Sequence, residues 1–101
     1  MFRYTTPRHT FTFPQDPSTY LGIRITYKQN GEIVLQKEKG DLSFDDVSNK
    51  AYFHLTQEET AKFKAGYDVK FQVHVQARDG NVYASEEMTL RVKDVLDNEE
   101  M

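Results

Sequence analysis

Residues 21–35, LGIRITYKQNGEIVL, decide the fold of this chain. Apolar side chains take every second position from Leu21 to Tyr27, and small or polar side chains take the positions between them. This period of two is typical of a strand with one buried face. Asn30 and Gly31 follow, the pair that best tolerates the positive φ angles of a type I′ turn, and an apolar run returns at 33–35. The stretch therefore predicts a β-hairpin.

The same alternation extends through the chain on both sides of the hairpin. It predicts further strands near residues 10–13, 42–44, 51–55, 69–77, 82–84 and 88–92. In the last two runs Val82, Ala84, Met88 and Leu90 are expected to face inward. Glu86 falls on this apolar phase, so we expect a bulge or a sheet edge there.

One short segment departs from the period of two. Thr56 and Glu59 are spaced as a capping box, in which each side chain satisfies a backbone amide of the other residue. Gly66 suits a left-handed stop. We therefore expect one short helical turn at residues 57–64, which carries the chain from one sheet to the other.

These elements together predict an all-β fold, an immunoglobulin-like two-sheet antiparallel β-sandwich of about seven strands. A small closed barrel shows the same alternation and remains the rival architecture. The expected organisation is an N-terminal arm at residues 1–8, the sandwich at 9–93 and an acidic C-terminal tail at 94–101.

Composition argues against several classes of function. The 101 residues include 13 Lys and Arg against 16 Asp and Glu, a net charge of -3, which does not suit binding to nucleic acid. No apolar run approaches the ~20 residues that cross a bilayer, and the first residues lack the apolar core of a signal peptide. The chain has no cysteine. We expect a protein made in a reducing cytoplasm, with no membrane or nucleic-acid partner.

The search for chemistry in the sequence favours a protein that is not an enzyme. His54 and His74 are expected on outward positions of strands and would form a surface metal site only if those strands were neighbours. Asp41, Asp45 and Asp46 lack the spacing of a calcium loop and read better as a polar turn. No nucleophile elbow, phosphate loop or dinucleotide fingerprint occurs. We expect no metal, no cofactor and no catalytic residue.

Three tyrosines offer the one candidate for ligand binding. Tyr52, Tyr67 and Tyr83 could stack against a sugar ring if they lay on one surface. Tyrosines are equally expected on half-buried strands from propensity and packing alone. A carbohydrate-binding module for host adhesion is therefore an alternative function.

Three segments carry a resemblance to a known group of proteins: residues 3–13, residues 55–63, and residues 79–92 with Asp79, Gly80 and Met88. Together they resemble short uncharacterised phage and prophage proteins of Firmicutes, encoded near virion structural genes. The 55–63 segment is similar to the crossover in the N-terminal sandwich domain of phage baseplate upper proteins. The resemblance implies a tail or baseplate component that is assembled in the bacterial cytoplasm, resides in the virion, and binds itself or other virion proteins as a homo-oligomer. It assigns no functional residue.

The N-terminal arm is the first candidate for such contacts. Phe2, Arg3 and Tyr4 mix aromatic and basic side chains in a segment with little reason to fold alone. We hypothesise that the arm reaches a neighbouring subunit; the alternative is that it pairs as the first edge strand. Tyr52, His54 and Tyr83 complete the set of possible interaction residues. A further alternative is a cytoplasmic protein that binds a host protein.

Overall fold

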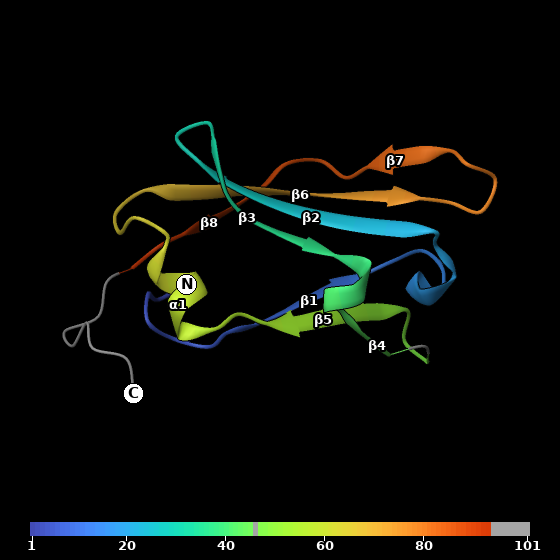
Figure 1. The fold of residues 1–101 in the computed structure, drawn as a ribbon, viewed down its shortest axis with the longest axis horizontal. Coiled ribbons are helices and arrows are strands. Elements are labelled where there is room, and N and C mark those ends of the chain that lie inside the picture. Colours follow the sequence, from blue (N-terminus) through green and yellow to red (C-terminus); the bar gives the residue numbers. More distant parts are fainter. Residues whose placement is uncertain (46, 94–101) are drawn as a thin grey trace.

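The structure, a computed structural model, describes residues 1–45 and 47–93 and consists of two antiparallel sheets packed face to face (Figure 1). The smaller sheet has the order β1-β5-β4, from β1 (Arg8–Thr12), β5 (Lys50–His54) and β4 (Ser43–Asp45). The larger sheet has the order β3-β2-β6, from β3 (Glu32–Glu38), β2 (Gly22–Gln29) and β6 (Asp68–Gln76). The far edge of β6 pairs with both β7 (Val82–Ala84) and β8 (Met88–Arg91). The predicted sandwich is confirmed, with eight strands; Asp46 and the expected acidic tail at 94–101 lie outside the described residues.

The strand order is that of an immunoglobulin-like domain in which one strand has no counterpart. In immunoglobulin notation the smaller sheet is B-E-D and the larger sheet is C′-C-F-G, with β7 and β8 sharing the place of strand G. A complete domain has a strand A beside strand B. Among the described residues no strand pairs with the free side of β1, which occupies the place of strand B.

The hairpin forms as the local sequence predicts. Asn30 and Gly31 have φ angles of 51° and 78°, as a type I′ turn requires. The register between β2 and β3 shifts after Tyr27, and this bulge accommodates the consecutive apolar residues of the return strand. Leu21 does not face the core as expected but is 59% exposed, because it precedes the start of β2 at the end of the sheet.

The crossover helix, α1 (Gln57–Ala61), begins with the predicted capping box. The Glu59 amide donates to Thr56 Oγ1 at 3.0 Å and the Thr56 amide donates to Glu59 Oε1 at 2.9 Å. The helix ends at Ala61, three residues before the predicted end, because the Lys64 amide donates to the buried side chain of Gln29 at 2.7 Å instead of continuing the helix. Two 3-10 turns, η1 (Pro17–Thr19) and η2 (Lys39–Asp41), complete the described elements.

The core lies where β2 crosses β5. The Tyr27 ring, fully buried, lies 6.5 Å from the Phe53 ring and 6.0 Å from the Phe63 ring, measured between centroids. These three aromatic side chains come from the two sheets and from the segment after α1, so burying them joins all three parts. The other fully enclosed side chains among the described residues are Pro17, Ile23, Ile25, Ala51, Leu55, Thr60, Val69 and Val92.

The last two strands are interrupted where the sequence predicts, but the residues that face inward are the predicted ones only in β8. β7 and β8 are separated at Ser85–Glu87, and Ser85 fills the gap by donating its amide to the Val73 carbonyl at 2.8 Å. Val75 faces the core and pairs with Tyr83, so Tyr83 rather than Val82 lies on the inner side of β7. The expected inward positions of Val82 and Ala84 are therefore wrong. The expected inward positions of β8, Met88 and Leu90, are correct, because the interruption at residues 85–87 shifts the alternation between the two strands.

The N-terminal arm contacts its own chain. The Arg3 amide donates to the Lys93 carbonyl at 2.9 Å, and Phe2 forms a parallel bridge with Lys93. The Thr60 hydroxyl, fully buried on α1, donates to the Thr5 carbonyl at 2.9 Å and accepts from the Thr5 amide at 3.1 Å. The arm therefore has contacts on its own chain, with Lys93 and with α1, and its contact with a neighbouring subunit stays a prediction.

The link between the arm and α1 leads to a stability prediction. Replacing Thr60 with valine keeps the side-chain volume but leaves the amide and carbonyl of Thr5 without their partner. We expect Thr60→Val to lower the free energy of unfolding by about 1–3 kcal/mol in denaturant titrations.

The matched control is Thr89→Val, at an exposed outer position of β8 opposite Lys70. This change should alter stability by less than about 0.5 kcal/mol. Equal effects of the two substitutions would show that Thr60 does not fasten the arm.

Candidate functional site

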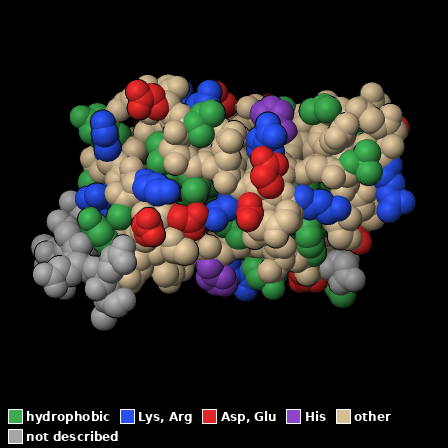
Figure 2. All heavy atoms as spheres, viewed as in Figure 1, with side chains coloured by type: hydrophobic (Ala, Val, Ile, Leu, Met, Phe, Trp, Pro, Cys, Tyr) green, Lys and Arg blue, Asp and Glu red, His purple; other side chains and the backbone are tan. Residues whose placement is uncertain are grey.

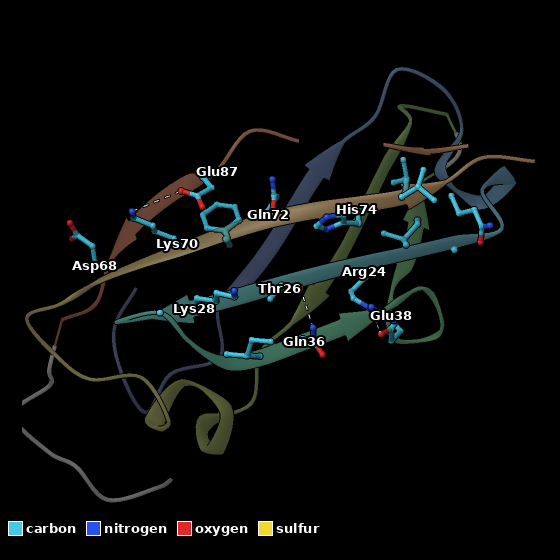
Figure 3. A pocket seen from close by; sticks show the side chains of 18 of the residues that line it. Arg24, Thr26, Lys28, Gln36, Glu38, Asp68, Lys70, Gln72, His74 and Glu87 are labelled. Atoms are coloured by element: carbon cyan, nitrogen blue, oxygen red, sulfur yellow. Dashed lines mark hydrogen bonds and ion pairs between the residues drawn. The ribbon is translucent and has the colours of Figure 1, made fainter. Parts of the chain in front are cut away.

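The outer face of the larger sheet is hollowed over β2, β3 and β6 (Figure 3). The hollow has a volume of about 980 Å³ and is lined mainly by polar side chains. Several of them pair across neighbouring strands: Arg24 Nε with Glu38 Oε1 at 2.8 Å, Gln36 with Thr26 at 3.3 Å, and Lys70 with Glu87 at 3.9 Å. Paired side chains of both charge signs are typical of a solvated sheet face. In Figure 2, too, basic and acidic side chains are interspersed over the visible face.

The inner face of the larger sheet is covered unequally. Side chains of β2 that face the smaller sheet, such as Ile25 and Tyr27, are fully buried. On β6 the inward Phe71 and Val75 are only partly buried. On β7 the inward Tyr83 is 54% exposed, and on β8 the inward Met88 is 37% exposed. Coverage is therefore incomplete at Phe71, Val75, Tyr83 and Met88, whereas the inward Val69 and Val73 of β6 are buried.

The cause is a mismatch in width between the two sheets. The Phe53 ring of β5 lies 6.5 Å from the Tyr27 ring of β2, and the Phe11 ring of β1 lies 6.0 Å from the Phe71 ring of β6. β5 thus lies against β2, and β1, at the edge of the smaller sheet, contacts β6 through Phe11 and β2 through His9. Since β7 and β8 pair with the far side of β6, they extend past β1. We call the side chains left partly uncovered there the open flank: Phe11, Phe71, Val75, Tyr83 and Met88.

On the side away from β5, the backbone of β1 pairs with no strand among the described residues. The Phe13 amide donates to the Asn49 carbonyl and the Leu55 amide donates to the Pro7 carbonyl, which makes the odd-numbered residues of β1 the hydrogen-bonded partners of β5. The N–H and C=O groups of the even-numbered residues consequently point away from β5. These residues, all exposed, are Arg8, Thr10 and Thr12.

A buried polar contact fixes β1 against the larger sheet. His9 Nδ1 and the Tyr27 hydroxyl lie 2.6 Å apart and share a hydrogen bond. Burial lowers the pKa of His9, and the nearby N-terminal ammonium lowers it further. Burial also raises the pKa of Tyr27, with a further contribution from Glu59. Both groups are therefore held in their neutral forms.

A second polar contact connects β3 with α1. Lys37 Nζ donates to Glu59 Oε2 at 2.6 Å, and both side chains are largely buried. Burial by itself would raise the pKa of Glu59, but the hydrogen bonds from Lys37 and Thr56 outweigh it and lower this pKa. The contact holds the crossover helix against the larger sheet.

The structure separates the three tyrosines expected to bind a sugar. Tyr52 lies on the outer side of the smaller sheet, where the guanidinium carbon of Arg8 is 3.8 Å from its ring centroid. Tyr83 lies on the inner side of the larger sheet, and Tyr67 precedes β6 at its opposite end. They do not form one platform. His54 and His74 belong to different sheets, so the condition for a paired histidine site, that their strands are neighbours, is not met.

The other predicted interaction residues lie on the arm. An Arg3 guanidinium nitrogen donates to the Ala61 carbonyl at 2.9 Å, and the Arg3 guanidinium lies 5.1 Å from the Tyr4 ring. Phe2 is 49% exposed beside Lys93.

Asp45, from the predicted acidic turn, accepts hydrogen bonds from the Val47 amide and the Ser48 hydroxyl, so its carboxylate stabilises the turn.

Sequence reasoning did not identify the open flank. Phe11, Phe71 and Val75 lie on the apolar positions of the strands expected near 10–13 and 69–77, and only Tyr83 was among the possible interaction residues. The one available signal was the interruption at Glu86, which indicated an irregular edge in this part of the sheet.

Among residues 1–45 and 47–93 no group of three or more acidic or histidine side chains could hold a metal ion. Within the same ranges no helix has the length and apolar character needed to cross a membrane.

The neutral state of His9 predicts a pH dependence of stability. The folded-state pKa of His9 lies below its usual value of 6.5, so the unfolded chain binds a proton more readily. This contribution to stability is fully present above pH 6.5 and declines as the pH falls below it. In urea titrations at about pH 7.5 and about pH 5.5, we expect His9→Gln to lose less stability than the wild type between the two conditions.

The control for this experiment is His54→Gln, at an exposed position of β5. This variant should keep the wild-type decline. A wild type whose stability stays constant across the interval would contradict the assignment of a neutral His9.

No protein-family model matches the chain, and no curated protein matches it.

Proposed function

We propose that this chain is a non-enzymatic structural protein of a phage or prophage virion, a tail or baseplate component that acts through protein–protein contacts. Its partners are other virion proteins or further copies of itself, and it is assembled in the bacterial cytoplasm. The open flank is the observation that supports a contact role. The virion assignment is supported by the resemblance of residues 3–13, 55–63 and 79–92 to phage and prophage proteins.

The open flank and the neighbouring edge of β1 support this role because they expose apolar side chains and backbone hydrogen-bonding groups. Tyr83 and Met88 leave apolar area in water, although their positions on the sheet are those of core residues. Along the exposed edge of β1, backbone donors and acceptors face no paired strand in the part of the chain that the structure describes. Aromatic and methionine side chains are enriched in protein interfaces, and strand edges can pair with another chain.

The virion assignment is tested by mass spectrometry of purified particles from a strain that carries the gene. We expect peptides of this chain in the particles at a fixed ratio to the major tail protein. An abundant cytoplasmic host protein, measured in the same samples, serves as the control for carry-over. Recovery of the chain only in the lysate, at the level of that host protein, would contradict the proposal.

A further inference from the structure

We propose that the edge of β1 and the open flank together bind one extended segment of a different polypeptide, which adds a strand beside β1. This inference rests on the proposed function and specifies the kind of partner. The segment carries apolar side chains at alternate positions and an acidic side chain at one of the positions between them. In immunoglobulin terms it supplies the strand beside strand B that no described residue of this chain supplies.

The backbone of β1 determines that the partner is extended. Arg8, Thr10 and Thr12 direct their N–H and C=O groups away from β5, so they present alternating donors and acceptors at the spacing of a strand. Another strand can satisfy all of these groups at once. A helix or a compact loop cannot, because a helix already uses its own backbone groups and a loop does not keep the strand spacing.

The side chains of the open flank determine the pattern of the partner. A strand added beside β1 continues the smaller sheet, so every second side chain points towards the larger sheet. There it meets Tyr83 and Met88, together with the exposed parts of Phe71 and Val75. Apolar side chains at these positions would cover the open flank. The remaining side chains point outward beside Arg8, Thr10 and Thr12, and an acidic one there complements the guanidinium of Arg8.

The width of the open flank determines that the partner contributes a single strand. β7 and β8 lie one strand beyond β6, which β1 contacts through Phe11 and Phe71, and neighbouring strands lie ~4.8 Å apart. A second copy of this chain could approach through its own β1, but its larger sheet would extend over the same space as β7 and β8. One segment drawn from a partner fits, whereas a second complete sandwich does not.

The N-terminal arm limits where the added strand can lie. The Met1 ammonium donates to the Arg91 carbonyl at 2.7 Å, and the Lys93 amide donates to the Met1 carbonyl at 2.8 Å. The arm therefore occupies the end of the border next to β8, where Leu90 is already packed against the core. The site that remains extends along β1 towards Phe13, past Met88 and Tyr83.

The probe is a capped synthetic heptapeptide with valine at its odd positions and glutamate or threonine at its even positions. Its length spans the five residues of β1 with one residue at each end. A peptide of the same composition, with the valines placed together, serves as the ligand control. Binding is measured by NMR titration of the ¹⁵N-labelled full chain. We expect the alternating peptide to bind, with shift changes at Thr10, Thr12, Tyr83 and Met88, and the control peptide to bind at least tenfold more weakly.

Two neighbouring residues of β7 provide matched protein variants. Tyr83 faces the open flank at 54% exposure, and Val82 faces the opposite side of the same strand at 63% exposure. We expect Tyr83→Ser to weaken peptide binding by about tenfold, because the peptide then loses an aromatic contact surface. Val82→Ser should leave the affinity unchanged. Both side chains are exposed, so neither substitution removes core packing.

A third variant tests the backbone pairing. Thr10→Pro removes an N–H group that faces away from β5, a position at which an edge strand tolerates proline. We expect this variant to fold, as judged by its NMR spectrum, and to lose measurable peptide binding. If it does not fold, Thr10 N-methylation in a semisynthetic chain makes the same test.

Three results would overturn the inference: no binding of the alternating peptide in preference to its control, equal affinities of Tyr83→Ser and Val82→Ser, or unchanged affinity when the Thr10 N–H is removed. These results leave the virion assignment intact, because that depends on finding the chain in purified particles. Conversely, absence of the chain from particles would contradict the virion assignment without changing the peptide affinities.

Discussion

The smaller sheet has three strands, and the larger sheet that it faces is four strands wide. This difference in width determines which inward side chains of the larger sheet are covered. The inner sides of β2, β6, β7 and β8 are apolar, and β3 presents Leu35 beside Lys37. The smaller sheet covers β2 and part of β6 but does not reach β7 and β8. Side chains that belong to the core by their position, Tyr83 and Met88 above all, are consequently left in water. The exposed edge of β1 lies at the border between the covered and the uncovered part.

The contacts that hold the two layers together lie on the covered side. Tyr27 packs against Phe53 and Phe63 and shares a buried hydrogen bond with His9, so one side chain of β2 contacts both β1 and β5. The Lys37–Glu59 contact adds a polar connection from β3 to α1. These contacts fix β1 in place from its inner side only. On its other side, β1 pairs with no strand among residues 1–45 and 47–93.

Features that depend on neighbours in sequence could be predicted, and those that depend on the assignment of strands to sheets could not. Asn30 and Gly31 specify their turn, and Thr56 and Glu59 specify their cap, because all of the contacts involved are local. The end of α1 was misplaced because the deciding contact, between Gln29 and the Lys64 amide, joins distant segments. The phase of β7 depends on the pairing of Tyr83 with Val75 across a turn. Period-two alternation indicates that a strand has one buried side, but in β7 it gave the wrong side. It also does not show whether a strand of the other layer lies opposite. The open flank could therefore not be found from the sequence.

Amide hydrogen exchange along β1 in the isolated full chain shows whether the outer edge of this strand is uncovered. If β1 is an uncovered edge, protection alternates: the amides of His9, Phe11 and Phe13 exchange slowly because they donate to β5, and those of Arg8, Thr10 and Thr12 exchange at rates close to those of exposed loops. Uniform slow exchange across all six residues would mean that this edge is already covered, and it would contradict the proposal that β1 can pair with an added strand.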